Sequence, residues 1–288
     1  MMTTIDLDQQ RRYFADEVAA IAAISTPGLV DALASVPRER FLHAGPWWVR
    51  SEVDMLGGPR QTPDADPRHV YHNYAIAIDP ARQLFNGVPG LIVSWIDRLE
   101  LTPGARVLHV GAGTGYYTGL IGHTVGPSGA VVAIEVDEQL AAHARESLAT
   151  YPWIDVRTAD AKGPFTERFD AILINAGVTH AQDAWLDALV PGGRMILPFT
   201  ATFSAMGPIG KGIAVRLTDT DGTLTARPIG MTAIFSGVGL RDDALNQSLG
   251  AALMKSPFPP IKRLRRDAHE PSSSCWLHGA TSCLSLEP

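Results

Sequence analysis

Three glycines at alternate positions mark the part of the chain best suited to chemistry. They are Gly111, Gly113 and Gly115, and they come directly after the apolar run 107–110. Glycine is favoured where a backbone turns tightly or approaches a ligand closely. A second apolar run, 130–134, is followed directly by Glu135. This acid lies about 20 residues after the glycines, which is the spacing at which an acidic side chain contacts the ribose of a bound nucleotide. The pattern predicts half of a nucleotide-binding site.

The glycine spacing narrows the choice of nucleotide. A dinucleotide fold has the pattern Gly-x-Gly-x-x-Gly, in which the last glycine lets a helix pack closely on a strand. Here Tyr116 stands at that sixth position, which disfavours a nicotinamide oxidoreductase. The chain also has no Gly-Lys-Ser/Thr sequence of a phosphate-binding loop. A turn around the amino-acid end of S-adenosylmethionine fits better, and an ordinary glycine-rich turn is the alternative.

The elements that must position this turn alternate between strand and helix. We expect strands at 106–110, 130–136, 154–158, 169–175 and 194–198, and helices at 117–125, 138–150 and 181–189. Such alternation predicts a parallel sheet with helices on both faces. Ligands of these sheets bind at the carboxyl ends of the strands, where the glycines and Glu135 fall.

The flanking segments have different patterns. Helical spacing predicts helices at 8–24, 27–36, 90–99 and 240–255, and residues 212–218 and 223–229 form a hairpin around Asp221-Gly222. Residues 51–79 are expected to be loops and short strands, and the last thirty residues to be irregular. We divide the chain into N-terminal helices and a substrate-side cap (1–80), a cofactor-binding domain (81–237) and a C-terminal helix with an irregular extension (238–288).

Composition excludes several classes of partner. The net charge of -6 disfavours nucleic acid, and the basic run Lys262–Arg266 is interpreted as a solvated surface. No apolar run is long enough to span a membrane and no signal peptide is visible, so a cytoplasmic location is expected. Cys275 and Cys283 are interpreted as free thiols, although they could form a disulfide. No group of cysteines and histidines has zinc-like spacing, so we expect no metal.

Several motifs together resemble those of one enzyme family. The sequence Val-Leu-His-Val-Gly-Ala-Gly-Thr-Gly-Tyr is similar to the first motif of class I S-adenosylmethionine-dependent methyltransferases. Within that superfamily, the segments 36–41 (VPRERF), 99–108, 169–173 and 189–198 resemble protein-L-isoaspartate O-methyltransferases. The resemblance runs from about residue 10 to residue 236. It implies a Rossmann-like α/β fold, doubly wound around a mainly parallel seven-stranded sheet with a terminal β-hairpin.

The resemblance also implies roles for individual residues. Glu135 is expected to accept hydrogen bonds from both ribose hydroxyls, because a carboxylate only accepts. Asp160 and Ala161 are expected near the adenine, and Asn175 and Ala176 beneath the sulfonium. The full set expected to bind S-adenosyl-L-methionine, and its product S-adenosyl-L-homocysteine, is His109, Gly111, Ala112, Gly113, Thr114, Gly115, Tyr116, Glu135, Val136, Asp160, Ala161, Asn175 and Ala176.

The chain departs from the family pattern at the substrate side. The family has a Thr-Ile-Ser-Gln-Pro element whose serine works at the active site; counted back from Gly104, this chain has Phe85-Asn86-Gly87-Val88-Pro89 instead. His109 stands where the family usually has a glutamate that supports the cofactor's amino group. About fifty residues after Gly237 have no counterpart in the compact family enzyme.

The methyl acceptor is therefore less well specified than the cofactor. The hypothesis we favour is a methyltransferase that esterifies a carboxylate of a peptide or protein-like substrate. A small-molecule methyltransferase is the alternative, and a binding module without activity is a third. Asn73, which replaces the acid of a Tyr-x-Asp element, and Asn86 are interpreted as orienting groups, and His72 or His180 as possible bases. The sequence predicts no oligomeric state.

Overall fold

The computed structural model describes residues 6–51, 57–203 and 207–288, and the chain forms two compact units. The first unit comprises residues Met1–Ala105 and Ala112–Thr158, and the second comprises Arg106–Gly111 and Ala159–Pro288. Each unit is described separately. Among the described residues, no helix combines the length and the apolar character that crossing a membrane requires.

The first unit holds five helices among its described residues. They are α1 (Leu7–Ala22), α2 (Pro27–Ser35), α3 (Pro89–Asp97), α4 (Tyr116–Val125) and α5 (Glu138–Ser147), with short 3-10 turns η1 (Arg38–Phe41) and η2 (Pro67–Val70). The apolar faces of α1 and α2 bury Phe14, Val18, Leu29 and Leu33. At the start of α5, the Asp137 side chain accepts from two backbone N–H groups that have no partner within the helix. The ends of these helices differ from the predicted ones by less than a turn.

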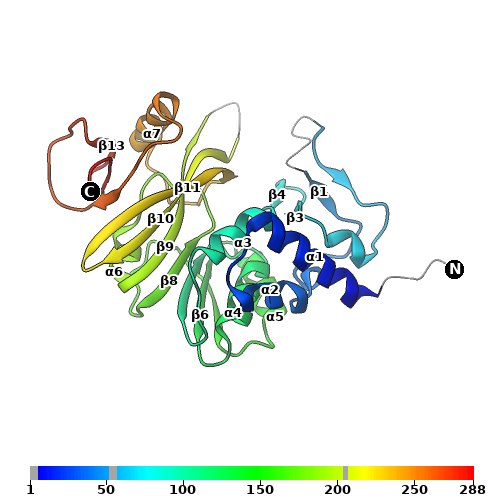
Figure 1. The fold of residues 1–288 in the computed structure, drawn as a ribbon. Helices are drawn as coiled ribbons and strands as arrows, with labels where there is room; N and C mark the ends of the chain where they lie inside the picture. The colour runs from blue at the N-terminus through cyan, green and yellow to red at the C-terminus, as the bar shows by residue number, and fades with distance from the viewer. Residues whose placement is uncertain (1–5, 52–56, 204–206) are drawn as a thin grey trace. The chain divides into compact units, whose positions relative to one another are not determined.

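The strands of the first unit belong to two groups. Strands β1 (Trp48–Arg50), β2 (Arg60–Gln61), β3 (Ala75–Asp79) and β4 (Leu84–Phe85) form a small sheet in the order β2-β1-β3-β4, with antiparallel pairing. Strands β6 (Ala130–Glu135) and β7 (Ile154–Thr158) form a parallel pair. The helices α1, α2 and α3 and the small sheet belong to the blue and cyan part of Figure 1.

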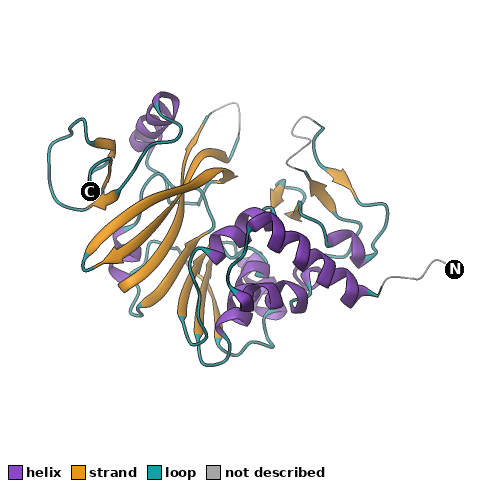
Figure 2. Ribbon diagram, viewed as in Figure 1, coloured by secondary structure: helices purple, strands orange, loops and turns teal. Residues whose placement is uncertain are grey.

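The second unit contains the long strands seen in Figure 2. Strands β5 (Arg106–Val110), β8 (Phe169–Ile174) and β9 (Leu189–Thr202) pair in parallel, and α6 (Asp183–Ala188) leads into β9. The predicted Pro191-Gly192-Gly193 turn is present as an irregularity near the start of β9, where the pairing with β8 shifts. These strands confirm the α/β class.

The predicted hairpin is present and is longer than expected. Strands β10 (Ile209–Thr220) and β11 (Thr223–Phe235) pair along their whole length, and β10 also pairs with β9. Asp221 and Gly222 have φ values of 52° and 82°. Positive φ at both central residues is the conformation that Asp-Gly favours in a two-residue hairpin turn.

The C-terminal extension is more regular than predicted. After α7 (Asp243–Lys255), three short strands follow: β12 (Arg263–Arg265), β13 (Cys275–His278) and β14 (Cys283–Ser285). They continue the antiparallel sheet beyond β11 in the order β11-β12-β14-β13 and bury Leu264, Leu277 and Leu284. Our expectation of irregular chain was wrong here, because strands of three or four residues are too short to give a readable alternation.

A buried arginine organises the loop that follows η2. The side chain of Arg38 has no exposed surface. Its Nη1 donates to the carbonyl oxygens of Val70 and His72 at 2.7 Å and 2.9 Å, and its Nη2 donates to that of Tyr74 at 2.9 Å. The fork of donors on a guanidinium suits such an array of carbonyls, which a lysine could not reproduce.

The same arginine also connects the loop to two helices. Its guanidinium carbon lies 5.6 Å from the ring centroids of both Phe14, on α1, and Tyr116, at the start of α4. The backbone N–H of Arg38 donates to the hydroxyl of Tyr71 at 3.1 Å, and that hydroxyl donates to Glu39. Burial, followed by the carboxylate of Glu39, raises the pKa of Tyr71. The network keeps η1, η2 and the loop 71–74 in one arrangement.

We predict that Arg38→Met lowers the free energy of unfolding by about 3 kcal/mol or more, because three carbonyl oxygens would each lose a donor at about 1 kcal/mol or more per group. Urea unfolding followed by tryptophan fluorescence measures the change. Arg12→Met, at an exposed position on α1, is the matched control and should have little effect. Equal losses in the two variants would contradict this role of Arg38.

Candidate functional site

The glycine turn is as tight as predicted. Gly111, Gly113 and Gly115 have φ values of 79°, 56° and 97°. Residues other than glycine rarely adopt this backbone conformation. A Cβ on Gly111 would lie 2.9 Å from the backbone oxygen of Asn175, and a Cβ on Gly115 would lie 3.0 Å from a methyl group of Leu148. The absence of a side chain at Gly111 therefore allows the backbone after β8 to approach closely. The absence of one at Gly115 allows the same for Leu148, at the end of α5.

Glu135 is held against the glycine turn within the first unit. Its Oε2 accepts from the backbone N–H of Gly113 at 2.7 Å, and its Oε1 accepts from that of Asp137 at 3.0 Å. The residue is 8% exposed. A carboxylate has about four acceptor positions, so each oxygen keeps capacity for another donor such as a ribose hydroxyl. The two backbone bonds fix where those acceptors point.

The other predicted cofactor residues of the first unit differ in their exposure. Ala112 and Thr114 are buried in the turn, while Val136 is 49% exposed at the end of β6. The ring of Tyr116 is buried, with its centroid 5.7 Å from that of Phe41 and 5.2 Å from that of Tyr117. Because its ring faces the protein interior, Tyr116 can offer a ligand only its backbone at the N-terminus of α4.

His109 lies in the second unit and is fully buried on β5. Its backbone pairs with that of Leu173 on β8. Burial lowers the pKa of His109 to about 3, so the imidazole is neutral throughout the physiological range. A neutral ring cannot supply the negative charge that the family's glutamate offers to the cofactor's amino group.

Asn175 and Ala176 follow directly after β8 and are partly exposed. The backbone N–H of Asn175 donates to the carbonyl of Val110 at 2.8 Å, which ties the ends of β5 and β8 together. Asp160 is exposed and accepts from the backbone N–H of Lys162 at 2.9 Å, whereas Ala161 is buried. Asn175 and Ala176 thus lie at the end of β8, and Asp160 and Ala161 lie in the segment of the second unit that begins at Ala159.

The two asparagines predicted to orient the acceptor are placed differently in the first unit. The Oδ1 of Asn73 accepts from the backbone N–H of Gly90 at 2.7 Å, near the start of α3. This contact satisfies a helix N–H, so Asn73 positions the loop 71–74. The Oδ1 of Asn86 accepts from the N–H of Ile76 at 3.0 Å, but its Nδ2 is buried with no hydrogen-bond partner among the described residues.

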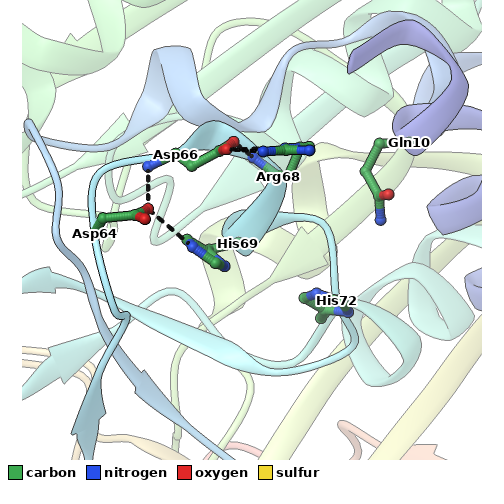
Figure 3. A pocket seen from close by; sticks show the side chains of 6 residues that line it. All are labelled: Gln10, Asp64, Asp66, Arg68, His69 and His72. Atoms are coloured by element: carbon green, nitrogen blue, oxygen red, sulfur yellow. Dashed lines mark hydrogen bonds and ion pairs between the residues drawn. The ribbon is translucent and has the colours of Figure 1, made fainter. Parts of the chain in front are cut away.

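His72 lines a cavity of about 310 Å³ in the first unit. Figure 3 shows Asp64, Asp66, Arg68 and His69 joined by hydrogen bonds in this cavity, with His72 and Gln10 outside that network. The Nε2 of His69 is 2.9 Å from Asp64 Oδ1. Desolvation lowers the pKa of His72 although much of the residue stays exposed, so its ring is neutral at physiological pH. Neutral imidazole is the form that accepts a proton.

His180 lies in the second unit, and both of its ring nitrogens have partners. Its Nδ1 is 3.0 Å from Thr179 Oγ1, and its Nε2 is 2.9 Å from the side-chain nitrogen of Gln182. The Thr179 hydroxyl also accepts from the backbone N–H of Asp242, just before α7. Desolvation lowers the pKa of His180. These contacts favour a positioning role, because a base needs a free lone pair directed at the acceptor.

Sequence reasoning missed one cluster of reactive side chains altogether. The side chains of His269, Cys275, His278 and Cys283 converge in the C-terminal strands. The Cys-x2-His-x4-Cys spacing was the available signal, but it contains no Cys-x2-Cys or His-x3–5-His pair of the common zinc motifs.

Comparison with known proteins matches this geometry to one family. Residues 59–210 match the family profile of protein-L-isoaspartate(D-aspartate) O-methyltransferase. Protein-L-isoaspartate O-methyltransferase 1 of Cupriavidus necator is 27% identical over 210 residues, which cover 68% of this chain and 71% of the relative. Protein-L-isoaspartate O-methyltransferase 2 of Polaromonas sp. is 31% identical over 170 residues, covering 58% of this chain and 75% of the relative.

Solved structures show the same fold. A protein-L-isoaspartate O-methyltransferase superposes with a TM-score of 0.62 at 20% identity, covering 87% of this chain and 73% of the other. A Plasmodium falciparum chain assigned to the same enzyme, in complex with S-adenosyl-L-homocysteine, superposes with a TM-score of 0.59 at 15% identity, covering 78% and 97%. The chain therefore belongs to the protein-L-isoaspartate(D-aspartate) O-methyltransferase family and is an S-adenosylmethionine-dependent methyltransferase with the class I α/β fold.

Proposed function

We propose that this enzyme methylates a carboxylate on a peptide or protein. The relatives are named for the methylation of isoaspartyl residues in proteins, which supports an acceptor of this class. One observation supports an acceptor that offers an oxygen, namely the buried Nδ2 of Asn86, which has no partner among the described residues. The identity of the acceptor within this class depends on the residues around Gly87.

The cofactor residues are assigned here by the family resemblance. We propose that Glu135 accepts from the ribose hydroxyls, and that the turn 111–115 contacts the methionine portion. In the second unit, Asp160 and Ala161 would hold the adenine, and Asn175 and Ala176 would lie at the sulfonium. S-adenosylmethionine, when bound, supplies an electrophilic methyl group. The fixed carboxylate of Glu135 and the three glycines of the turn fit such a ligand.

Asn86 supplies the donor that an ionised acceptor needs. Because its Oδ1 is bound to the N–H of Ile76, the direction of its Nδ2 is set by the β3 backbone. An unmatched buried donor costs about 1–3 kcal/mol, a cost that a bound carboxylate would remove. A carboxylate has a reference pKa near 4 and is ionised at neutral pH. It therefore requires alignment with the methyl carbon and no general base.

Gly87 argues against isoaspartyl peptides as the preferred acceptor. Its φ is 80°, and a Cβ at this position would lie 3.1 Å from Ile92. Its carbonyl accepts from the hydroxyl of Tyr117 at 3.1 Å. The loop is therefore built around a glycine, and a serine would strain it. We infer that the acceptor is held by Asn86 without the serine hydroxyl of the family, and that other peptide carboxylates are preferred.

We predict that Glu135→Ala weakens S-adenosylmethionine binding by about 1–3 kcal/mol, the cost of losing a charged hydrogen-bond partner. Titration calorimetry with S-adenosylmethionine and with S-adenosylhomocysteine measures the change. Glu138→Ala, an exposed acid three residues further on, is the control and should bind as the wild type does. Unchanged affinity in Glu135→Ala would remove Glu135 from the ribose site.

We predict that Asn86→Asp lowers kcat/KM for peptide carboxylates by about tenfold or more. The substituted side chain still accepts from Ile76, but it loses a donor and adds a repelling charge; the loss of a hydrogen bond to a charged group costs about 1.5–3 kcal/mol. Binding of S-adenosylmethionine should be unchanged. Gln83→Glu makes the same amide-to-acid change at an exposed position nearby and should retain activity.

The acceptor panel for this assay contains matched peptides with an aspartyl, an isoaspartyl or a C-terminal carboxylate, and small carboxylic acids. We expect peptides with an aspartyl or a C-terminal carboxylate to be methylated faster than the matched isoaspartyl peptides. Preferred turnover of isoaspartyl peptides would show that the serine is dispensable. Turnover of small acids alone would favour the small-molecule alternative.

A further inference from the structure

Two cysteines and two histidines meet at the C-terminal strands of the second unit, three of them on β13 and β14 and His269 in the loop between β12 and β13. One ligand atom from each of His269, Cys275, His278 and Cys283 lies within 4.8 Å of all the others. Cys283 is buried, and the other three residues are half-buried. The two cysteines are not joined by a disulfide. The cluster is separate from the residues assigned above to cofactor and acceptor.

The backbone brings these side chains to one face. His278 and Cys283 are paired across β13 and β14, which places them side by side. Residues three apart on a regular strand point to opposite faces, so Cys275 and His278 would normally diverge. A bulge between Cys275 and Leu277 adds one residue to β13. The added residue restores a common face for Cys275 and His278.

The orientation of His269 is typical of a metal ligand. Its Nδ1 is 2.8 Å from the backbone oxygen of Asp267, so the proton resides on Nδ1 and donates to that carbonyl. The lone pair of Nε2 then points into the cluster, 3.5 Å from the Sγ of Cys275. Ligating histidines almost always donate their other N–H to a carbonyl or carboxylate in this way.

The remaining members of the cluster also have features of a ligand set. The Nδ1 of His278 is buried and has no hydrogen-bond partner among the described residues. The ring centroids of His269 and His278 lie 4.8 Å apart, and the planes of the two rings make an angle of 84°. The two imidazoles therefore enter the cluster from different directions. The backbone N–H of Ser272 donates to the Sγ of Cys275 at 3.4 Å, a contact that stabilises a thiolate.

We propose that His269, Cys275, His278 and Cys283 bind one structural Zn²⁺. Two thiolates and two imidazoles are one of the common ligand sets of closed tetrahedral zinc sites. Bond lengths of about 2.3 Å to sulfur and 2.0 Å to nitrogen give tetrahedron edges of roughly 3.3–3.8 Å. The 3.5 Å separation of Nε2 and Sγ already matches these edges, and the wider pairs contract on binding.

A metal ion has a clear structural task in this segment. Strands β12, β13 and β14 have three or four residues each and bury few apolar side chains. Structural zinc contributes directly to the folding of such small elements. The hairpin β13–β14 also borders a cavity of about 10 Å³, where Leu277 and Gly279 face Thr179 and His180. The metal would thereby fix one wall beside the loop that carries His180.

The decisive experiment uses the full-length enzyme purified without chelators and under reducing conditions. Metal analysis by mass spectrometry should give one zinc per chain. Replacement by Co²⁺ should give the intense visible absorption of a tetrahedral site and a thiolate charge-transfer band. Removal of the metal by a chelator should lower the melting temperature, and added Zn²⁺ should restore it.

The variants Cys275→Ser and Cys283→Ser should abolish stoichiometric zinc and the charge-transfer band. His123→Ala, which changes a histidine on α4 outside the cluster, should retain both. S-adenosylmethionine affinity, measured on every variant, shows that the cofactor-binding part remains folded. Zinc-free wild-type enzyme that also gives no tetrahedral Co²⁺ spectrum would overturn the proposal. A Cys275–Cys283 disulfide that persists under these reducing conditions would equally overturn it.

Discussion

A single buried guanidinium determines the shape of the segment 70–74, which carries the candidate residues His72 and Asn73. Arg38 donates to three carbonyls of the segment 70–74 and contacts the rings of Phe14 and Tyr116. Burying a charge is costly unless hydrogen bonds compensate it, so this arrangement tolerates few alternatives. Asn73 then extends the constraint to the start of α3, close to Asn86 and Gly87 in the chain. The candidate residue Asn73 is thereby held by the interior of the first unit.

The cofactor side depends on a different constraint, which is the conformation of the glycine turn. Positive φ at three glycines allows a backbone N–H to reach Glu135, and that contact directs the carboxylate. We propose that this part of the chain contacts S-adenosylmethionine. On the proposed acceptor side, Gly87 provides no hydroxyl, and Asn86 would provide a donor whose direction is set by its contact with Ile76. In our proposal, the family's methyl source and an acceptor other than an isoaspartyl peptide are compatible, because the two depend on separate groups of residues.

The sequence predicted the parts of the fold that local patterns control. The glycine turn, the strands β5 and β7, and the Asp-Gly hairpin were located because turn chemistry and apolar runs are local signals. The burial of Arg38 was not predictable, because its partners lie more than thirty residues away in the chain. The contact of Asn73 with Gly90 was not predictable either, because it depends on the packing of α3. The strands β12–β14 were missed because they are too short to give a readable alternation. The cluster of His269, Cys275, His278 and Cys283 was missed because a bulge, invisible in the sequence, brings Cys275 and His278 to one face.

The central claim is that the methyl group is transferred to a carboxylate oxygen. The most direct measurement incubates the enzyme with methyl-labelled S-adenosylmethionine and a peptide acceptor, and then exposes the product to mild base. A carboxyl methyl ester hydrolyses under these conditions, so the account predicts that the label is released as volatile methanol. Label that stays on the acceptor after base treatment would identify an ether or amine product and would contradict the account.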